Sequence, residues 1–111
     1  MPTDPAFEPF RVDVHHEDAR VRVVPVGELD LATAPAVDEA LRAAYDLDQQ
    51  AVAIDLRKVI FMDSSGLRLI LRWNAAAREE ARWFGVIPGA QVVQRVFEAT
   101  RVAEHLTFVE P

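Results

Sequence analysis

Apolar and polar residues alternate singly from Phe10 to His15, near the start of the chain. A period of two is the pattern of a half-buried β-strand. After a polar turn, the valine-rich run from Val21 to Val26 predicts a second strand. Pro25 has no backbone N–H to donate, so we expect a gap in the hydrogen-bond ladder or a sheet edge there. Together the two runs predict a β-hairpin.

Three later segments carry apolar residues at the three- and four-residue spacing of amphipathic helices. The first runs from about Ala34 to Tyr45, with Thr33 as its N-cap and Pro35 in its first turn. The second runs from about Ser65 to Glu80, and the third from Gln91 to Thr100. The residues predicted to face inward are Val37, Leu41, Ala44 and Tyr45, then Leu67, Leu69, Ile70, Leu71, Trp73 and Asn74, then Val92, Val93, Val96 and Phe97.

Buried strands are predicted between these helices, over Ala51 to Leu56 and Trp83 to Pro88, and a short final strand over Leu106 to Val109. The order is then β-β-α-β-α-β-α-β. Strands that alternate with helices favour parallel pairs joined by right-handed crossovers. The prediction is one α/β domain over residues 9–111, with a mixed, mostly parallel sheet, preceded by a disordered, proline-rich lead-in at residues 1–8.

Composition narrows the possible functions. The chain has 111 residues, enough for one domain with its own core. It has no cysteine, which excludes disulfides, thiolate zinc sites and a cysteine nucleophile. Its net charge of -6 argues against nucleic acid and favours a basic protein surface as partner. Because the first residues do not form a signal peptide and no apolar run could span a bilayer, we expect a soluble, cytoplasmic protein.

The sequence carries no pattern of a catalytic or cofactor site. Its four glycines do not form a phosphate-binding loop or a dinucleotide fingerprint. His15 and His16 are adjacent and therefore point to opposite faces of a strand, and His105 lies far away in the sequence. We therefore expect no cofactor, no metal and no enzymatic activity.

The most informative segment is FMDSSGL, residues 61–67. A buried strand ends near Leu56, the chain turns, and a helix begins at the double serine. A helix start offers unpaired amides and a partial positive charge, which can meet a phosphate carried by a serine. Local physics alone favours a simpler interpretation, in which Asp63 or Ser64 only caps the helix. Of the two serines, we expect the Ser64 hydroxyl to be the one that caps the helix.

The FMDSSGL segment resembles the signature of bacterial anti-sigma-factor antagonists, which belong to the STAS family. GELD, residues 27–30, is similar to the second marker of that family, and one helix and one strand separate the two. VVQRVFE, residues 92–98, resembles its last long helix. The resemblance covers nearly everything from Phe10 to Val109.

The resemblance implies a switch. Such proteins bind an anti-sigma factor, usually a serine kinase, and so free a sigma factor for transcription. The kinase uses ATP and magnesium to phosphorylate the second serine of the motif, here Ser65. Phosphorylation releases the partner, and a separate phosphatase resets the switch. Asp63 would orient the serine and the kinase contact. The partner-binding residues implied are Glu28, Asp30, Asp63, Ser64 and Gly66.

Simple electrostatics agrees with such a switch. A phosphoserine carries about 1.5–2 negative charges. Beside Asp63, and with Asp30 across the loop, that charge would be repelled, and a covering partner would desolvate it. An unpaired buried charge costs several kcal/mol, and each ~1.4 kcal/mol is a tenfold change in affinity.

The chain departs from the family at two turns where glycine is common. Glu80, Ala81 and Arg82 follow the motif helix, which predicts a longer helix, and Arg101 follows the last one. Leu29 and Leu67, although they belong to the motifs, are predicted to be packing residues.

Three alternatives remain open. A STAS module can serve the assembly of a signalling or transport complex with its serine unmodified. An enzyme with Ser65 as nucleophile would need a nearby base, and the sequence has neither a G-x-S-x-G elbow nor a credible histidine. A receiver domain phosphorylated on Asp55 or Asp63 would need an acidic pair near the end of its first strand, which is missing.

Overall fold

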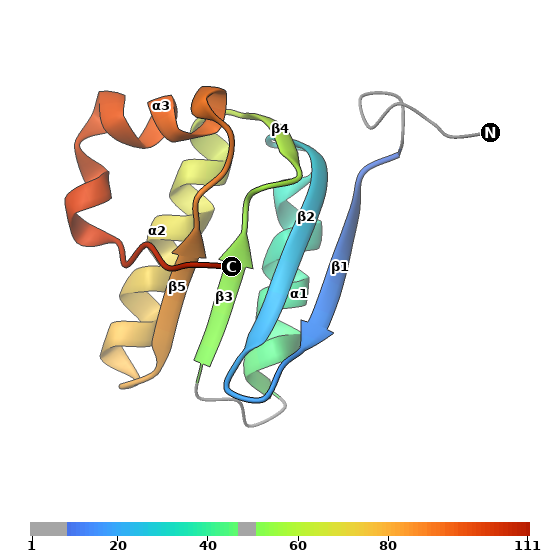
Figure 1. Ribbon diagram of the computed structural model, residues 1–111, viewed down its shortest axis with the longest axis vertical. Helices are drawn as coiled ribbons and strands as arrows, with labels where there is room; N and C mark the ends of the chain where they lie inside the picture. The colour runs from blue at the N-terminus through green and yellow to red at the C-terminus, as the bar shows by residue number, and fades with distance from the viewer. Residues whose placement is uncertain (1–8, 47–50) are drawn as a thin grey trace.

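The computed structural model describes residues 9–46 and 51–111 (Figure 1). The predicted lead-in, residues 1–8, lies outside this part of the chain. The elements in chain order are β1 (Arg11–His16), β2 (Val21–Leu29), α1 (Ala34–Asp46), β3 (Ala51–Asp55), β4 (Val59–Met62), α2 (Ser64–Glu79), β5 (Trp83–Ile87), α3 (Gln91–Thr100) and the 3₁₀ helix η2 (Val102–His105).

One mixed sheet contains all five of these strands, in the order β1-β2-β3-β5, with β4 also paired to β2. β1 is antiparallel to β2, and the other pairs are parallel. The helices α1 and α2 make the crossovers between parallel strands. These observations confirm the predicted α/β class, the N-terminal hairpin and the mostly parallel sheet.

Strand β2 changes its partner along its length. It pairs with β3 at Val21–Val23 and with β4 at Gly27–Leu29. The register shifts between Gly27 and Glu28, and Gly27 has a φ of +118°, which other residues rarely adopt. Pro25 lies between the two parallel pairings, where a gap in the ladder was predicted. The bulge carries β2 on to Leu29, beyond its predicted end at Val26.

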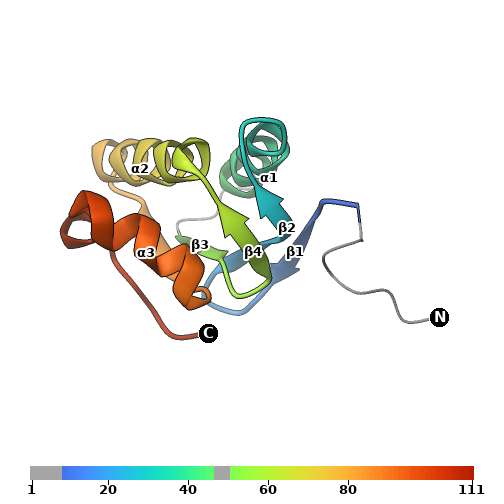
Figure 2. The same ribbon diagram turned by 90° about the horizontal axis from the view of Figure 1, so that it is seen from above.

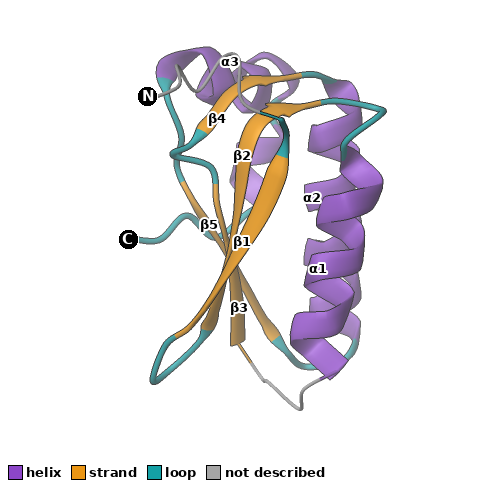
Figure 3. Ribbon diagram, turned by 90° about the vertical axis from the view of Figure 1, so that its right-hand side faces the viewer, coloured by secondary structure: helices purple, strands orange, loops and turns teal. Residues whose placement is uncertain are grey.

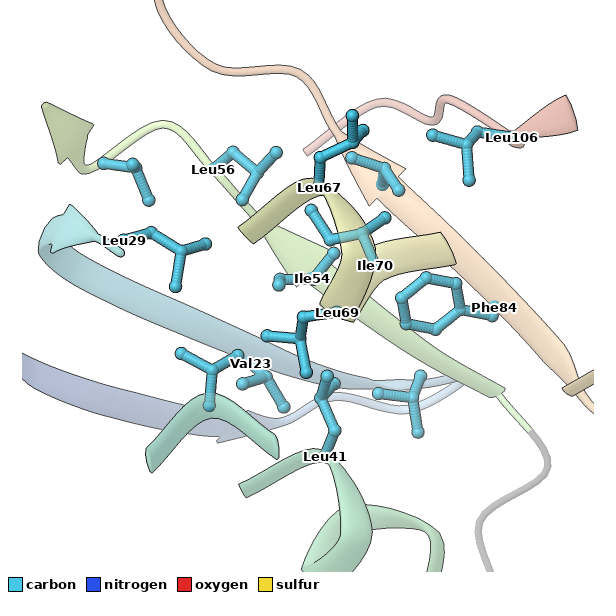
Figure 4. Packing of buried hydrophobic residues seen from close by; sticks show 14 of the residues in the cluster. Val23, Leu29, Leu41, Ile54, Leu56, Leu67, Leu69, Ile70, Phe84 and Leu106 are labelled. Carbon is cyan, nitrogen blue, oxygen red and sulfur yellow. The ribbon is translucent and has the colours of Figure 1, made fainter. Parts of the chain in front are cut away.

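The helices α1 and α2 lie side by side on one face of the sheet, whereas α3 packs against β4 (Figures 2 and 3). The core lies between the sheet and the first two helices (Figure 4). The predicted stripe of α1 is buried, as are the odd-numbered face of β2 and the even-numbered face of β3. Fully buried examples are Val23, Leu41, Ile54, Leu56, Leu69 and Ile70.

Strand β4 was not predicted, because only a turn was expected between Leu56 and the motif helix. The strand has four residues, of which Ile60 and Phe61 are exposed between the buried Val59 and Met62. Two exposed apolar residues in succession break the alternation by which a strand is recognised. Its pairing with β2 is a tertiary contact, which local pattern does not report.

The predicted final strand, 106–109, is a single bridge between Phe108 and Val86. Val86 donates to the Thr107 carbonyl, and Val109 donates to the Val86 carbonyl. The chain then leaves β5 and crosses the sheet, where the Glu110 carbonyl accepts from Arg20 (Figure 1). The 3₁₀ helix η2, which precedes this segment, was also not predicted.

The prediction for the third helix is wrong at one position. Val92 is 47% exposed, whereas Val93 and Phe97 are fully buried and Val96 is half-buried. Val93, Val96 and Phe97 follow the i, i+3, i+4 spacing of a single inward stripe. Val92 lies beside that stripe and faces away from the core.

The motif helix does not extend past its predicted end near Glu80. It ends at Glu79, and Ala81 takes the left-handed conformation with a φ of 55°. Ala81 donates to the Arg78 carbonyl and Arg82 to the Ala77 carbonyl, which is the Schellman pattern of a helix end. Arg101 is also left-handed, with a φ of 60°. Both helices therefore end in a left-handed residue although neither position is a glycine.

Replacing either residue by glycine should stabilise the protein. A left-handed residue with a Cβ costs roughly 1–2 kcal/mol, and the extra unfolded-state entropy of glycine offsets about half of that. We expect Ala81→Gly and Arg101→Gly each to raise the free energy of unfolding in urea by about 0.5–1 kcal/mol. The control is Ala75→Gly, at an exposed position inside α2. It should lower that free energy by about 1 kcal/mol, and an equal loss at all three sites would contradict the explanation.

A buried carboxylate lies on the face of the sheet that α1 and α2 leave uncovered. Asp55 is 1% exposed and adjoins Ile54, whose side chain enters the core from the opposite face. One Asp55 oxygen accepts from Arg22 at 2.9 Å and from Arg57 at 2.7 Å. Burial raises the pKa of Asp55, but hydrogen bonds from Arg57 and Arg22 outweigh it and leave this pKa below its ordinary value. This engaged carboxylate argues against a receiver domain phosphorylated on Asp55.

We expect Asp55→Asn to lower the free energy of unfolding by about 2–4 kcal/mol, since both arginines lose a buried partner. Because the folded-state pKa of Asp55 is lowered, its contribution is present above the ordinary carboxyl pKa of 3.8 and is lost as pH falls below it. Urea unfolding at several pH values should therefore show a shallower acid-side loss in Asp55→Asn than in wild type. The exposed Asp13→Asn is the control, and it should change stability by less than about 0.5 kcal/mol.

Candidate functional site

The two motifs recognised in the sequence meet at one end of the sheet. Leu29 of β2 is the register partner of Met62 of β4. One residue further on, the Asp63 amide donates to the Leu29 carbonyl at 3.2 Å. The GELD segment and the FMDSSGL segment therefore run side by side, at the carboxyl ends of two parallel strands. Such ends are where α/β proteins commonly build their sites.

Asp63 begins the motif helix. Its backbone is extended, and its Oδ1 accepts from the Ser65 amide at 2.8 Å. This is the geometry of an N-cap, in which a side chain satisfies an amide of the first turn. Of the two candidate caps, Asp63 is therefore confirmed, and the expectation for the Ser64 hydroxyl is wrong because Ser64 is already the first helical residue. The Ser64 side chain is instead exposed.

Gly66 allows the first turn of α2 to approach the sheet closely. A Cβ at this position would lie 2.6 Å from Met62 Cγ and 2.9 Å from Leu29 Cγ. Only a residue without a side chain fits there, so the glycine sets the height at which Ser65 stands above the strand ends. Gly66 is buried, so it cannot contact a partner directly and can affect one only by positioning the first turn of α2. Leu29 and Leu67 are also buried, which confirms their predicted packing role.

The loop after β2 is held by its own side chains. Asp30 Oδ1 accepts from the amides of Ala32 at 3.0 Å and Thr33 at 3.1 Å. Thr33 Oγ1 accepts from the Asp30 amide and donates to the Glu28 carbonyl at 2.7 Å. The hydroxyl of Thr33 thus closes the loop, and it does not serve as the predicted helix cap. The Glu28 side chain is exposed to solvent.

A cleft of about 360 Å³ opens between α1 and α2 next to Ser65. Ser65 is half-buried and its hydroxyl makes no hydrogen bond to any other described residue. The residues that line the cleft are Leu31, Ala34, Pro35, Asp38, Ser65, Arg68 and Arg72. A modifying group on Ser65 therefore has room beside it, and two arginines face that room.

Sequence reasoning missed four residues of this region. Leu31 is 77% exposed and Phe61 is 46% exposed, so apolar side chains reach solvent on both motif segments. Leu31 directly follows the GELD segment in an exposed turn, so its side chain is not buried in the core. Arg68 and Arg72 follow Ser65 by three and seven positions, a spacing that places all three on one helix face. That spacing could have been recognised from the sequence alone.

All six predicted site residues lie at this end of the molecule. Glu28 and Asp30 come from the end of β2 and its loop, and residues 63–66 from the start of α2. The carboxylates of Asp30 and Asp63 are each bonded to backbone amides. Among the described residues, no three carboxylates or histidines gather as metal ligands. Every helix in the same part of the chain is too short or too polar to span a membrane.

The chain belongs to the STAS domain family, since the family described as "Mlab, STAS domain" matches residues 11–110. Anti-sigma-F factor antagonist RsfB of Mycobacterium tuberculosis is 33% identical over 69 residues, which cover 62% of this chain and 56% of that protein. The match thus spans little more than half the length of that relative.

Solved structures agree with the sequence match. An anti-sigma factor antagonist from Mycobacterium paratuberculosis is similar with a TM-score of 0.78 and 28% identity, over 93% of this chain and 86% of that one. The Bacillus cell fate determinant SpoIIAA in its phosphorylated form shares the fold, with a TM-score of 0.66 and 18% identity over 91% of each chain. Homologues by sequence and by structure therefore include anti-sigma factor antagonists, which confirms the resemblance.

The cap assignment predicts different effects for two neighbouring residues. Asp63→Ala removes the acceptor of the Ser65 amide and should lower the free energy of unfolding by about 0.5–2 kcal/mol. Ser64→Ala removes an exposed hydroxyl and should change it by less than about 0.5 kcal/mol. Urea unfolding of the two variants measures both. A larger loss in Ser64→Ala than in Asp63→Ala would show that the cap is misassigned.

Proposed function

We propose that this protein is an anti-sigma-factor antagonist that is switched off by phosphorylation of Ser65. In its unmodified form it binds an anti-sigma factor with serine kinase activity and thereby frees a sigma factor. The kinase transfers phosphate from ATP to the Ser65 hydroxyl, and the complex dissociates. A phosphatase restores the unmodified form. The protein acts in the cytoplasm as a binding module and not as an enzyme.

The observation that carries the proposal is the position of Ser65. Its hydroxyl has no partner among the described residues, it borders an open cleft, and its own amide is held by Asp63. A kinase needs an acceptor hydroxyl that it can reach and that is not already engaged in another contact. Ser64 is more exposed but lies outside the cleft lining. The relationship to anti-sigma factor antagonists supports the same residue through its motif.

The surface around Ser65 supports a protein partner. Leu31 and Phe61 present apolar side chains to solvent, and Glu28 adds an exposed carboxylate. Apolar anchors with a charged rim are common at protein interfaces. The net charge of -6 would steer the protein towards a basic surface. Glu28, Asp30, Asp63, Ser64 and Gly66 are proposed to form or support this contact surface.

A phosphate at Ser65 would weaken such a contact strongly. It would bring about 1.5–2 negative charges to the centre of the surface. A covering partner would have to desolvate them, which costs several kcal/mol when they are not matched. A loss of ~2.8 kcal/mol is a hundredfold change in affinity.

An enzymatic role for Ser65 has less support. A serine nucleophile needs a base within hydrogen-bond reach. No histidine lines the cleft beside Ser65, and the hydroxyl has no hydrogen-bonded base among the described residues. The arginines that line the cleft are protonated at every relevant pH and accept no proton. Asp38, which also lines it, accepts from Trp73 and Arg42 and makes no hydrogen bond to Ser65.

Substitutions at the two serines test the proposal. With the cognate anti-sigma kinase and ATP, wild type should lose at least tenfold in affinity as phosphate accumulates. Ser65→Ala lacks the acceptor and should stay bound under the same conditions. Ser65→Asp carries less charge than a phosphate and should bind several-fold more weakly than wild type without ATP. Isothermal calorimetry measures the affinities, and peptide mass spectrometry locates the phosphate.

Ser64→Ala is the matched control, because it removes a neighbouring hydroxyl and leaves Ser65 in place. It should still accept phosphate and release its partner. Phosphate found on Ser64 with Ser65 unmodified would contradict the residue assignment. Binding without phosphate on either serine would favour the alternative of an unmodified STAS assembly module.

A further inference from the structure

The motif helix places an arginine beside the proposed phosphorylation site. Arg68 follows Ser65 by three residues, so their Cβ atoms lie about 5–6 Å apart on one face of α2. Both residues line the cleft between α1 and α2. The two helices lie side by side above the sheet (Figure 2). A phosphate on Ser65 would therefore be within reach of the Arg68 guanidinium.

Arg68 is the cation near Ser65 that nothing else engages. Its side chain is exposed and makes no ion pair or hydrogen bond within residues 9–46 and 51–111. Arg72, one turn further on, lies 3.9 Å from Asp38. Asp38 in turn accepts from Trp73 at 2.9 Å and from Arg42 at 3.2 Å. The acid of the cleft is thus occupied, and Arg68 keeps its full donor set for another anion.

The surrounding charges would direct a phosphate towards Arg68. Asp63, the N-cap of α2, accepts from the Ser65 amide, is absent from the cleft lining and would repel the phosphate. Arg68 and Arg72 on α2 would attract it, and among the described residues the only acid in the cleft lining is Asp38 of α1. The free amides at the start of α2 add to this attraction.

We propose that Arg68 clamps the phosphate of phosphorylated Ser65 inside this cleft, with Arg72 as a weaker second contact. The inference rests on the proposed function, because it concerns the modified state of the same serine. Guanidinium and phosphate form charge-assisted, often bidentate hydrogen bonds. The clamp makes the off state a defined structure in which the phosphate is held and partly shielded. The arginine thus lengthens the time that the switch stays off.

The test uses the full chain with phosphoserine incorporated at position 65 during translation, so that it needs no kinase or partner. The second pKa of the phosphate, near 6 in an unstructured peptide, is followed by phosphorus NMR as the pH is varied. A bound guanidinium favours the dianion and lowers this pKa. Arg68→Gln should raise it by about 0.3 unit or more relative to wild type. Arg72→Gln should raise it by less.

The matched control is Arg78→Gln, which removes an equal charge from the last turn of the same helix. It should leave the phosphate pKa at its wild-type value. Arg68→Lys keeps the charge but not the two parallel donors of the guanidinium, so its phosphate pKa should fall between those of wild type and Arg68→Gln. This variant also keeps the test informative if Arg68→Gln folds poorly. A shift in Arg68→Gln no larger than in Arg78→Gln would overturn the clamp.

A second readout addresses shielding. Alkaline phosphatase should remove the phosphate several-fold faster from Arg68→Gln than from wild type or Arg78→Gln, and equal rates would refute the shielding. Neither measurement depends on a kinase, so a protein that is never phosphorylated by its partner would refute the proposed function and leave these results standing. The two failures are therefore distinguishable.

Discussion

The contact between the first turn of α2 and the ends of β2 and β4 is the constraint on which the site depends. Gly66 makes that contact possible, because a Cβ would collide with Met62 and Leu29. Beyond the bulge at Gly27, β2 no longer pairs with β3 and instead pairs with β4. The strand ends then form a floor under the helix. Ser65 lies above these strand ends with its amide bonded to Asp63 and its hydroxyl unbonded among the described residues, so its backbone position is fixed.

Stability and switching are placed in different parts of the fold. The buried Asp55 and its two arginines lie on the sheet face opposite α1 and α2. The proposed switch lies between those helices, where charged side chains remain exposed and weakly paired. Charges that are buried and mutually satisfied are costly to disturb, whereas exposed ones can exchange partners at little cost. A charge added at Ser65 can therefore change binding without unfolding the domain.

Ser65 has both negatively and positively charged side chains around it. The carboxylates of Asp30 and Asp63 are engaged with backbone amides, so their first task is to shape the two motif loops. The arginines on the next turns of α2 are left to face the cleft. Repulsion by the acids alone was the expectation from the sequence. The three-dimensional arrangement adds an attractive side, and the proposed switch combines the two.

The sequence by itself determined the order of the elements from β1 to α3 with the exception of β4, the three helices with most of their inward residues, and the two motifs that identify the family. These features follow from short-range periodicity and from residue types that suit turns and helix starts. Strand β4 and the bridge at Phe108 were decided only by tertiary structure. In both cases a segment distant in the sequence supplies the hydrogen-bonding partner, β2 for β4 and Val86 for Phe108. The cleft likewise exists only because two helices pack side by side, which the pattern within one helix does not encode.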